Sequence, residues 1–306
     1  MNIAICGLGV QGRKRKALLD KNQVITIDPF NENAHFSKLI QAKKENFEAV
    51  FICTPDSEKF SLIIESLKLG KHVLVEKPLL LSPSEFNLAK KLSKSKNLTV
   101  YEAYNHRFEP HIVNVKNALD EALIGEIYKV KFFYGNGTAQ LVKQSSWKDS
   151  KEGVLTDLGS HLCDLLLYFF GMRNLKVDFV QRENFENLSS DNVLVQLSEK
   201  FTVLMEMSLL SWKNTFRLEI IGSAGSIHVE GLCKWGPSIF TIRKRKFPSG
   251  EPEEITEIIE SIDPTWEKEM SHFFELIASK NSGNLTNSEY ITNILRTISQ
   301  FSTPSK

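Results

Sequence analysis

Short apolar runs alternate with longer amphipathic stretches over the first hundred residues of the chain. Strands of a parallel sheet are buried on both faces and read as short apolar runs, whereas the helices that connect them have one apolar face. The pattern therefore predicts helices crossing over a parallel, doubly wound sheet. The predicted strands are Asn2–Cys6, Val24–Asp28, Ala49–Cys53, His72–Glu76 and Leu98–Tyr101. The predicted helices are Val10–Asp20, Asn33–Glu45, Ser57–Leu69 and Pro83–Ser95.

From about residue 122 the pattern changes to strand-like runs with few helices between them, which is typical of an α+β domain. Ser223-Ala224-Gly225 separates two such runs and predicts a hairpin turn. The apolar stretch Val154–Phe170 has the length of a helix and stops at Gly171. Amphipathic runs from Pro264 to Ser279 and from Asn287 to Phe301 predict two more helices. The predicted strands are Glu126–Tyr134, Val193–Leu197, Phe201–Leu210, Phe216–Ile221 and Ser226–Glu230.

This change of pattern divides the 306 residues into two predicted domains, 1–121 and 122–306. The C-terminal helix is a candidate to pack back on the first domain.

The chain has 38 basic and 37 acidic side chains, a balance that argues against a nucleic-acid-binding protein. It has no apolar run of membrane-spanning length, and its apolar N-terminus precedes the basic cluster Arg13–Lys16, the reverse of a signal peptide. We therefore expect a cytoplasmic protein. Its four scattered cysteines favour reduced thiols, and we expect no metal.

A glycine-rich segment, Gly7-Leu8-Gly9-Val10-Gln11-Gly12, follows the first predicted strand and opens the first predicted helix. In such a turn the first glycine permits the tight bend, the second lets a pyrophosphate approach, and the third lets helix and strand pack closely. The N–H groups at the helix N-terminus bind the phosphates. Asp28, at the end of the second strand, can accept hydrogen bonds from both ribose hydroxyls and would repel a 2′-phosphate. The segment predicts NAD binding, with NADP as the second candidate and a purely structural turn as the alternative.

The basic cluster Arg13–Lys16 follows this turn directly. We interpret most of it as the solvated face of the first helix, with Arg13 as a candidate phosphate contact.

Two further segments carry candidate chemistry. Glu76-Lys77-Pro78 ends the fourth predicted strand, where open α/β sheets bind ligands, and Lys77 there can stabilise a developing alkoxide. In the second half, Asp157, His161 and Asp164 share one face if their segment is helical. A histidine can take the proton of a hydroxyl while hydride leaves the carbon. A buried histidine satisfied by a neighbouring aspartate, or an Asp–His–Asp metal site, remains an alternative.

Taken together, these motifs resemble the glucose–fructose oxidoreductase / inositol dehydrogenase / rhizopine catabolism (Gfo/Idh/MocA) family. The motifs that carry the resemblance are Gly7–Gly12, Cys53-Thr54-Pro55, Gly70–Pro78, Asn105-His106-Arg107-Phe108 and Asp157–Asp164. The resemblance implies a Rossmann domain followed by an α+β domain with a large, mostly antiparallel, open-faced sheet, which often forms a homodimer or homotetramer interface. It also implies NAD(P)-dependent hydride transfer at a carbinol of a sugar, cyclitol or nucleotide-sugar.

The same resemblance implies roles for individual residues. Lys77 would contact substrate and nicotinamide ribose, His161 would be the general acid/base, and Asp157 would be its neighbour in the substrate site. Further positions match family segments along the cofactor (Thr54, Pro55, Glu76) and around the substrate (Asn105, Arg107, Trp147, Lys148). Two departures concern the pocket: Lys151-Glu152-Gly153-Val154 replaces a glycine pair or triplet, and Lys59 or Phe60 stands where many relatives have histidine.

Two other functions remain open at this point. A non-catalytic ligand sensor would keep the cofactor and sugar sites but often loses the catalytic side chains, which are present here as Lys77, Asp157 and His161. An NAD-dependent glycosidase would use the same hydride transfer transiently and release a cleaved sugar.

Overall fold

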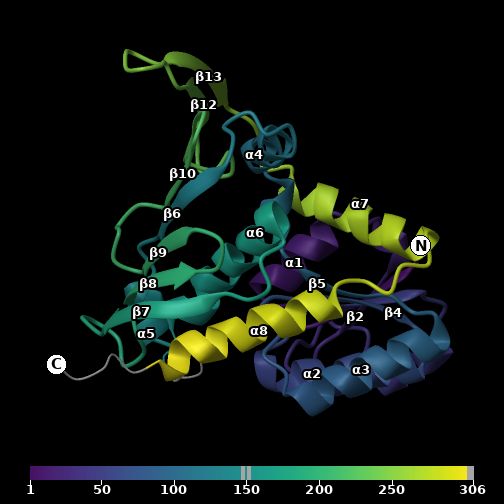
Figure 1. Ribbon diagram of the computed structural model, residues 1–306. Coiled ribbons are helices and arrows are strands. Elements are labelled where there is room, and N and C mark those ends of the chain that lie inside the picture. Colours follow the sequence, from purple (N-terminus) through teal and green to yellow (C-terminus); the bar gives the residue numbers. More distant parts are fainter. Residues whose placement is uncertain (146–148, 150–152, 302–306) are drawn as a thin grey trace. The chain divides into compact units, whose positions relative to one another are not determined.

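Figure 1 shows a computed structural model of the chain, which describes residues 1–145, 149 and 153–301. The chain forms two compact units. Unit 1 comprises Met1–Asn105 and Trp266–Thr292, and unit 2 comprises His106–Thr265 and Asn293–Lys306. The domain boundary predicted after residue 121 lies within unit 2 and stays a prediction for the limits of the folding domains.

Unit 1 is built on a five-stranded parallel sheet with the strand order β2-β1-β3-β4-β5. The order reverses between β1 and β3, and open α/β sheets bind ligands beyond the carboxyl ends of the strands at such a point. The doubly wound N-terminal sheet predicted from the sequence is thus confirmed. The strands are β1 (Ile3–Cys6), β2 (Val24–Ile27), β3 (Ala49–Ile52), β4 (His72–Glu76) and β5 (Val100–Ala103).

Helices cover both faces of this sheet, which explains why its strands are apolar throughout (Figure 1). One face packs against α2 (Asp56–Lys68) and α3 (Pro83–Lys96). The other packs against α7 (Thr265–Ala278), whose Phe273 meets Phe51 edge to face. Two more helices contribute to the unit: α1 (Val10–Ala17), which follows the glycine turn, and the first half of α8 (Leu285–Gln300).

The helix predicted over Asn33–Glu45 is wrong. Its first part is extended, because Phe36 bridges to Ile27 and exchanges backbone hydrogen bonds with the β2 segment. Only a short 3₁₀ helix, Leu39–Lys44, follows. Pairing along β2 outweighs the amphipathic pattern of this segment.

Unit 2 contains an eight-stranded sheet with the order β13-β12-β11-β10-β6-β9-β8-β7, in which only the β6–β9 pair is parallel. One face is buried, whereas the other carries half-exposed side chains such as Lys131 and Glu219, so the sheet is open-faced as the family resemblance implies. The predicted hairpin at Ser223–Gly225 joins β10 to β11 and is confirmed. The strands are β6 (Ile127–Gly135), β7 (Lys176–Glu183), β8 (Asn192–Ser198), β9 (Thr202–Ser208), β10 (Thr215–Gly222), β11 (Gly225–Glu230), β12 (Ser238–Lys244) and β13 (Glu253–Ile259).

The buried helix predicted over Val154–Phe170 is confirmed as two joined parts. A π-helical turn, Leu155–Gly159, leads directly into α6 (Ser160–Phe170), which ends at Gly171 in the left-handed conformation. Three smaller helices and the second half of α8 also belong to this unit. The smaller helices are a 3₁₀ turn (Asn105–Phe108) that begins at the last residue of unit 1, α4 (Pro110–Asp120) and α5 (Ala139–Lys143). Among the described residues, no helix combines the length and hydropathy needed to span a membrane.

Candidate active site

The glycine turn of unit 1 leaves room where a dinucleotide would need it. A side chain at Gly7, whose φ is +92°, would meet the Cys53 carbonyl oxygen at 2.6 Å, and one at Gly12 would meet the Gly7 carbonyl oxygen at 1.9 Å. These two glycines are therefore required by the protein's own packing. A side chain at Gly9 would meet nothing within 4 Å. Gly9 also caps α1 without any side-chain hydrogen bond, so the helix presents its first N–H groups to a ligand.

Asp28 lies over this turn. Its Oδ2 accepts a hydrogen bond of 2.7 Å from the Leu8 N–H, and its Oδ1 accepts one of 2.8 Å from the Phe30 N–H. Each carboxylate oxygen has a second lone pair, so the group can still accept hydrogen bonds from two ribose hydroxyls. Arg13 turns back to the same turn and donates to the Leu8 carbonyl at 3.1 Å. These residues fit a bound dinucleotide.

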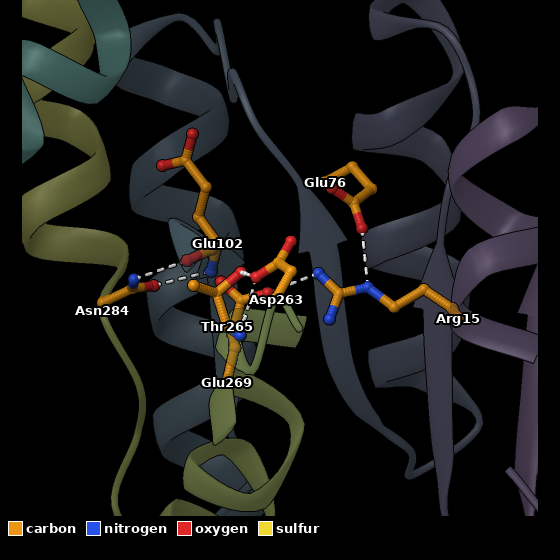
Figure 2. Close-up of polar contacts among 7 residues, drawn as sticks. All are labelled: Arg15, Glu76, Glu102, Asp263, Thr265, Glu269 and Asn284. Atoms are coloured by element: carbon orange, nitrogen blue, oxygen red, sulfur yellow. Dashed lines mark hydrogen bonds and ion pairs between the residues drawn. The ribbon is translucent and has the colours of Figure 1, made fainter. Parts of the chain in front are cut away.

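Arg15 is the exception in the basic cluster, because it is fully buried instead of solvated. Its Nε donates to Glu76 at 2.8 Å and a terminal nitrogen donates to Glu269 at 2.5 Å, as Figure 2 shows. The guanidinium also packs over the Trp266 ring, 4.5 Å from its centroid. Burial alone would lower the pKa of Arg15, but the two carboxylates outweigh it and raise that pKa. We call Arg15, Glu76 and Glu269 the ion cluster.

The turn that carries Lys77 is held from three sides. Lys59, buried at the N-terminal end of α2 and ion-paired with Asp56, donates to the Pro78 carbonyl at 2.7 Å. The Leu79 N–H donates to Glu102 at 2.7 Å, and the Thr292 hydroxyl donates to the Leu79 carbonyl at 2.7 Å. Lys59 thus explains one departure from the family pattern: a lysine at this position fastens the turn that follows β4.

Glu102 is itself buried and fixed. Asn284 binds its backbone N–H and carbonyl, as Figure 2 shows. Burial raises the pKa of the Glu102 carboxyl, and hydrogen bonds from neighbours including Ser288 and Tyr104 offset that effect only in part. Glu102, which accepts the hydrogen bond from Leu79, is therefore a rigid support for the turn that contains Lys77.

In unit 2, His161 lies in a group of rings and one cation. Its imidazole stacks on that of His106, with centroids 3.9 Å apart and planes inclined by 20°, and the Tyr134 ring lies 6.1 Å away. The Lys234 ammonium is 2.7 Å from His106 Nε2 and 4.5 Å from the centre of the Trp235 ring. We call His106, His161 and Lys234 the histidine cluster.

The two aspartates predicted to share a face with His161 have different surroundings. Asp164 is buried and binds Arg107 through two hydrogen bonds, of 2.5 and 2.7 Å. Burial nevertheless raises the pKa of Asp164 above its usual value. Asp157 is exposed in the π-helical turn, and its charge adds to burial in raising the pKa of the Tyr134 phenol. Asp157 is therefore close enough to Tyr134 for its charge to act on the aromatic residues around His161.

A short loop, Gly231–Pro237, brings Lys234 and Trp235 to this site. Glu109, buried directly before α4, accepts hydrogen bonds from the Cys233 N–H at 2.5 Å and from its thiol at 3.2 Å. Burial, followed by the neighbouring Glu109 carboxyl, raises the pKa of Cys233 to about 11, so the thiol stays protonated. The loop is thus anchored at the residue before Lys234.

The remaining predicted site residues are placed as follows. Thr54 and Pro55 follow β3 and lead into α2, and the Thr54 side chain lies beside Gly7. Asn105 is buried at the end of unit 1. Trp147 and Lys148 lie outside the described residues. The described residues contain no group of three or more histidine, cysteine or acidic side chains arranged to hold a metal ion.

Sequence reasoning missed Tyr134, Lys234 and Trp235 and assigned no role to His106. The only signal was the motif Asn105–Phe108, which contains His106. No spacing pattern relates a strand residue at 134, a loop at 234 and a helix at 161.

A parallel sheet with a glycine turn at its switch point, followed by a unit with an antiparallel sheet, defines a Rossmann-type nucleotide-binding protein with a second domain. Two family models match the chain: the oxidoreductase family with an NAD-binding Rossmann fold over residues 23–104, and the GFO/IDH/MocA C-terminal domain over residues 112–228. The chain belongs to the GFO/IDH/MocA family of oxidoreductases, and its first domain is an NAD-binding Rossmann domain.

Individual relatives agree with this assignment. An uncharacterized oxidoreductase of Schizosaccharomyces pombe is 33% identical over 129 residues, which cover 41% of this chain and 34% of the relative. The scyllo-inositol 2-dehydrogenase (NADP(+)) of Bacillus subtilis is 25% identical over 190 residues, 60% of this chain and 52% of the relative. These matches span about a third to a half of the relatives' own length. The solved structure of levoglucosan dehydrogenase in complex with NADH has the same fold, with a TM-score of 0.84 and 18% identity over 98% of this chain and 96% of that one.

Proposed function

We propose that this protein is an NAD(P)-dependent oxidoreductase that transfers hydride between the nicotinamide and a carbinol or carbonyl of a sugar, cyclitol or nucleotide-sugar. The observation that carries the proposal is the way Lys77 is presented at the end of β4, on a turn fixed by Lys59, Glu102 and Thr292. A side chain that must stabilise charge on a reacting oxygen has to be held in place before the reaction. Relatives named as inositol dehydrogenases support the substrate class.

The chain's own residues divide the work. NAD(P), when bound, supplies the hydride acceptor or donor. His161 takes the proton of the substrate hydroxyl during oxidation and returns it during reduction. Lys77 donates a hydrogen bond to the same oxygen and stabilises its negative charge, while Asp157 orients the centre. We assign substrate contacts to Asn105 and Arg107, and to Trp147 and Lys148 beyond the described residues.

For the cofactor, we favour NAD. Asp28 places a carboxylate over the glycine turn and keeps it there through the Leu8 and Phe30 N–H groups. A 2′-phosphate would meet that charge at short range. Cofactor contacts are assigned to Gly7, Gly9, Val10, Gln11, Gly12, Asp28, Thr54, Pro55, Glu76 and Lys77.

We assign a homo-oligomer interface to the open face of the unit 2 sheet. Charged side chains of both signs and apolar ones mix there around a depression of 310 Å³, whose lining includes Lys131, Glu206, Arg217, Glu219 and Phe133. A face that carries charges of both signs can pair with its own copy in a two-fold contact.

Binding and turnover assays test the function together. Calorimetry is done with NAD, NADH, NADP and NADPH, each repeated with a panel of inositols, sugars, sugar acids and nucleotide-sugars. We expect tighter binding of NAD(H) than of NADP(H), and one substrate class that binds to the protein–NAD(H) complex. Preference for NADP(H) would contradict the role of Asp28. Sugar release without net NADH would instead indicate a glycosidase, and binding without either reaction a sensor. If no dinucleotide bound, the oxidoreductase proposal would fall.

Turnover of His161→Asn tests the catalytic assignment. This variant should bind NAD as the wild type does and lose about 10²–10⁴-fold in kcat, the usual contribution of a general acid/base. His272→Asn, a half-exposed histidine of α7, is the matched control and should keep full activity. Normal turnover by His161→Asn would show that another group moves the proton.

A further inference from the structure

Three segments far apart in the sequence bring a lysine and two histidines together in unit 2. His106 comes from the 3₁₀ turn before α4, His161 from the first turn of α6, and Lys234 from the loop between β11 and β12. Lys234 Nζ is 2.7 Å from His106 Nε2, and the His106 ring lies flat on the His161 ring at 3.9 Å. The contacts thus run in a line from the cation through one imidazole to the other.

The first contact fixes the chemical state of His106. A lysine ammonium has three donors and no acceptor, so Nε2 of His106 must accept the hydrogen bond. An imidazole nitrogen that accepts carries no proton, and the ring is then neutral with its proton on Nδ1. The positive charge beside the ring opposes any second proton.

The second contact transmits this state to His161. Two stacked rings at 3.9 Å repel each other strongly if both are charged. Because Lys234 keeps His106 neutral, a proton that enters the pair goes to His161. A general acid/base needs this freedom to change charge.

The placement of Lys234 is built into the fold. Glu109 fixes the neighbouring Cys233 by two hydrogen bonds, and Ser238 at the other end of the loop donates to the Gly231 carbonyl at 3.2 Å. Other titratable and charged groups surround the cluster on each element that packs there: Tyr134 of β6, Asp157 of the π-helical turn, the Arg107–Asp164 pair, and Glu109 behind Lys234. Of these, Tyr134 stays neutral, because burial raises the pKa of its phenol, and Arg107 and Asp164 neutralise each other.

We propose that Lys234 and His106 are positioning residues for His161: Lys234 holds His106 neutral in its Nδ1–H tautomer, and the stacked neutral ring directs proton uptake to His161. The role of His161 itself rests on the proposed function, whereas the state of His106 does not.

The test reads the protons directly. The full-length protein, labelled with ¹⁵N-histidine, is titrated and its imidazole nitrogens are observed by NMR, with His106 and His161 assigned from the His106→Gln and His161→Asn variants. In the wild type we expect His106 to keep a bare Nε2 and a protonated Nδ1 while His161 titrates alone. In Lys234→Met we expect the proton to be shared, so that both rings titrate in two coupled steps. Lys234→Arg should restore the wild-type pattern.

Two further variants keep the test sharp. Lys246→Met, an exposed lysine beyond β12, is the matched control and should titrate as the wild type. Lys234→Gln keeps a donor without the charge, so it should preserve the tautomer but allow His106 to protonate. If Lys234→Met failed to fold, the tautomer of His106 in the wild type and the titration of Lys234→Gln would still test the proposal.

A proton on Nε2 of wild-type His106, or identical titrations of wild type and a folded Lys234→Met, would overturn the proposal. These outcomes are independent of turnover and of dinucleotide binding, so they are distinguishable from failure of the proposed function. Once a substrate is known, the acid limb of kcat/KM against pH should move in Lys234→Met and stay in place in Lys246→Met.

Discussion

The two units bury polar groups in opposite ways. The ion cluster of unit 1 contains one guanidinium between two carboxylates, all nearly inaccessible to solvent. The histidine cluster of unit 2 contains two stacked imidazoles and a lysine that is half exposed. The first arrangement holds opposite charges together away from solvent, whereas we propose that the second takes up and releases a proton at His161.

This difference matches the parts that the units would play in hydride transfer. Under the proposed function, the nucleotide-binding domain has to hold Glu76 and the Lys77 turn in one geometry, and the buried ion pair of Arg15 with Glu76 contributes to this. A substrate domain has to move a proton, so its central residue must be surrounded by groups that leave its charge free to change.

Removing the cation of the ion cluster should have the largest effect. Arg15→Met leaves Glu76 and Glu269 without their shared partner, and breaking a buried pair in this way costs about 3–5 kcal/mol. Urea unfolding measures the loss. Lys14→Met, on the exposed side of the same helix, should change stability little. A loss below about 1 kcal/mol for Arg15→Met would mean that the cluster behaves like a surface pair.

Arg107→Met tests whether unit 2 also depends on a buried pair. The substitution removes both hydrogen bonds to Asp164, and we expect a loss of about 1.5–3 kcal/mol in unfolding free energy. The predicted substrate contact of Arg107 would instead appear as a raised KM. A raised KM with unchanged stability would show that the pair with Asp164 contributes nothing to the fold and that Arg107 serves the substrate.

Lys59→Met loosens the Lys77 turn without touching the ion cluster. The Pro78 carbonyl loses its hydrogen bond from Lys59, and a displaced Lys77 should lower kcat by about 10–100-fold with little change in NAD affinity. Lys59→Arg keeps a cationic donor and should recover part of the rate. Full kcat in a stable Lys59→Met would contradict the role of this contact.

Glu102→Gln should give the smallest effect, and one that depends on pH. Burial raises the pKa of Glu102 in the folded state, so below the unfolded value near 4.5 both states are protonated and the residue costs nothing. As pH rises from there, the unfolded chain ionises first and wild-type stability falls until the folded pKa is passed. Glu102→Gln has no ionisable group at this position, so its unfolding free energy does not fall for this reason as pH rises. Unfolding at several pH values should show the variant gaining stability over the wild type toward neutral pH and no gain near pH 4.

The sequence predicts the sheet of unit 1 well, because fully buried strands are short apolar runs. β4, His72–Glu76, is predicted with its observed bounds. β13, Glu253–Ile259, escapes prediction because it is exposed along its length and mixes acidic with apolar residues, so no buried face marks it. The sequence also does not predict β7, β12, α4 or α5.

The candidate site also has a part that the sequence predicts and a part that it does not. The glycine turn, Asp28 and Lys77 lie at strand ends, and strand ends can be read from the pattern. The burial of Arg15 could not be predicted, since its partners Glu76 and Glu269 come from β4 and α7, and an arginine in a basic cluster is usually solvated. The histidine cluster depends on contacts 55 or more residues apart, which no local pattern encodes. The roles of Lys77, Asp157 and His161 stay predictions.

The division of the chain between the units has a consequence for synthesis on the ribosome. Unit 1 takes its last residues from 266–292, which supply Glu269 to Arg15, Asn284 to Glu102 and Thr292 to Leu79. The ribosome makes the intervening stretch, residues 106–265, in about 8–32 s, at its usual rate of 5–20 residues per second. During that time Arg15 and Glu102 are made without these partners, so the nascent N-terminal sheet stays incomplete until residues 266–292 have been translated.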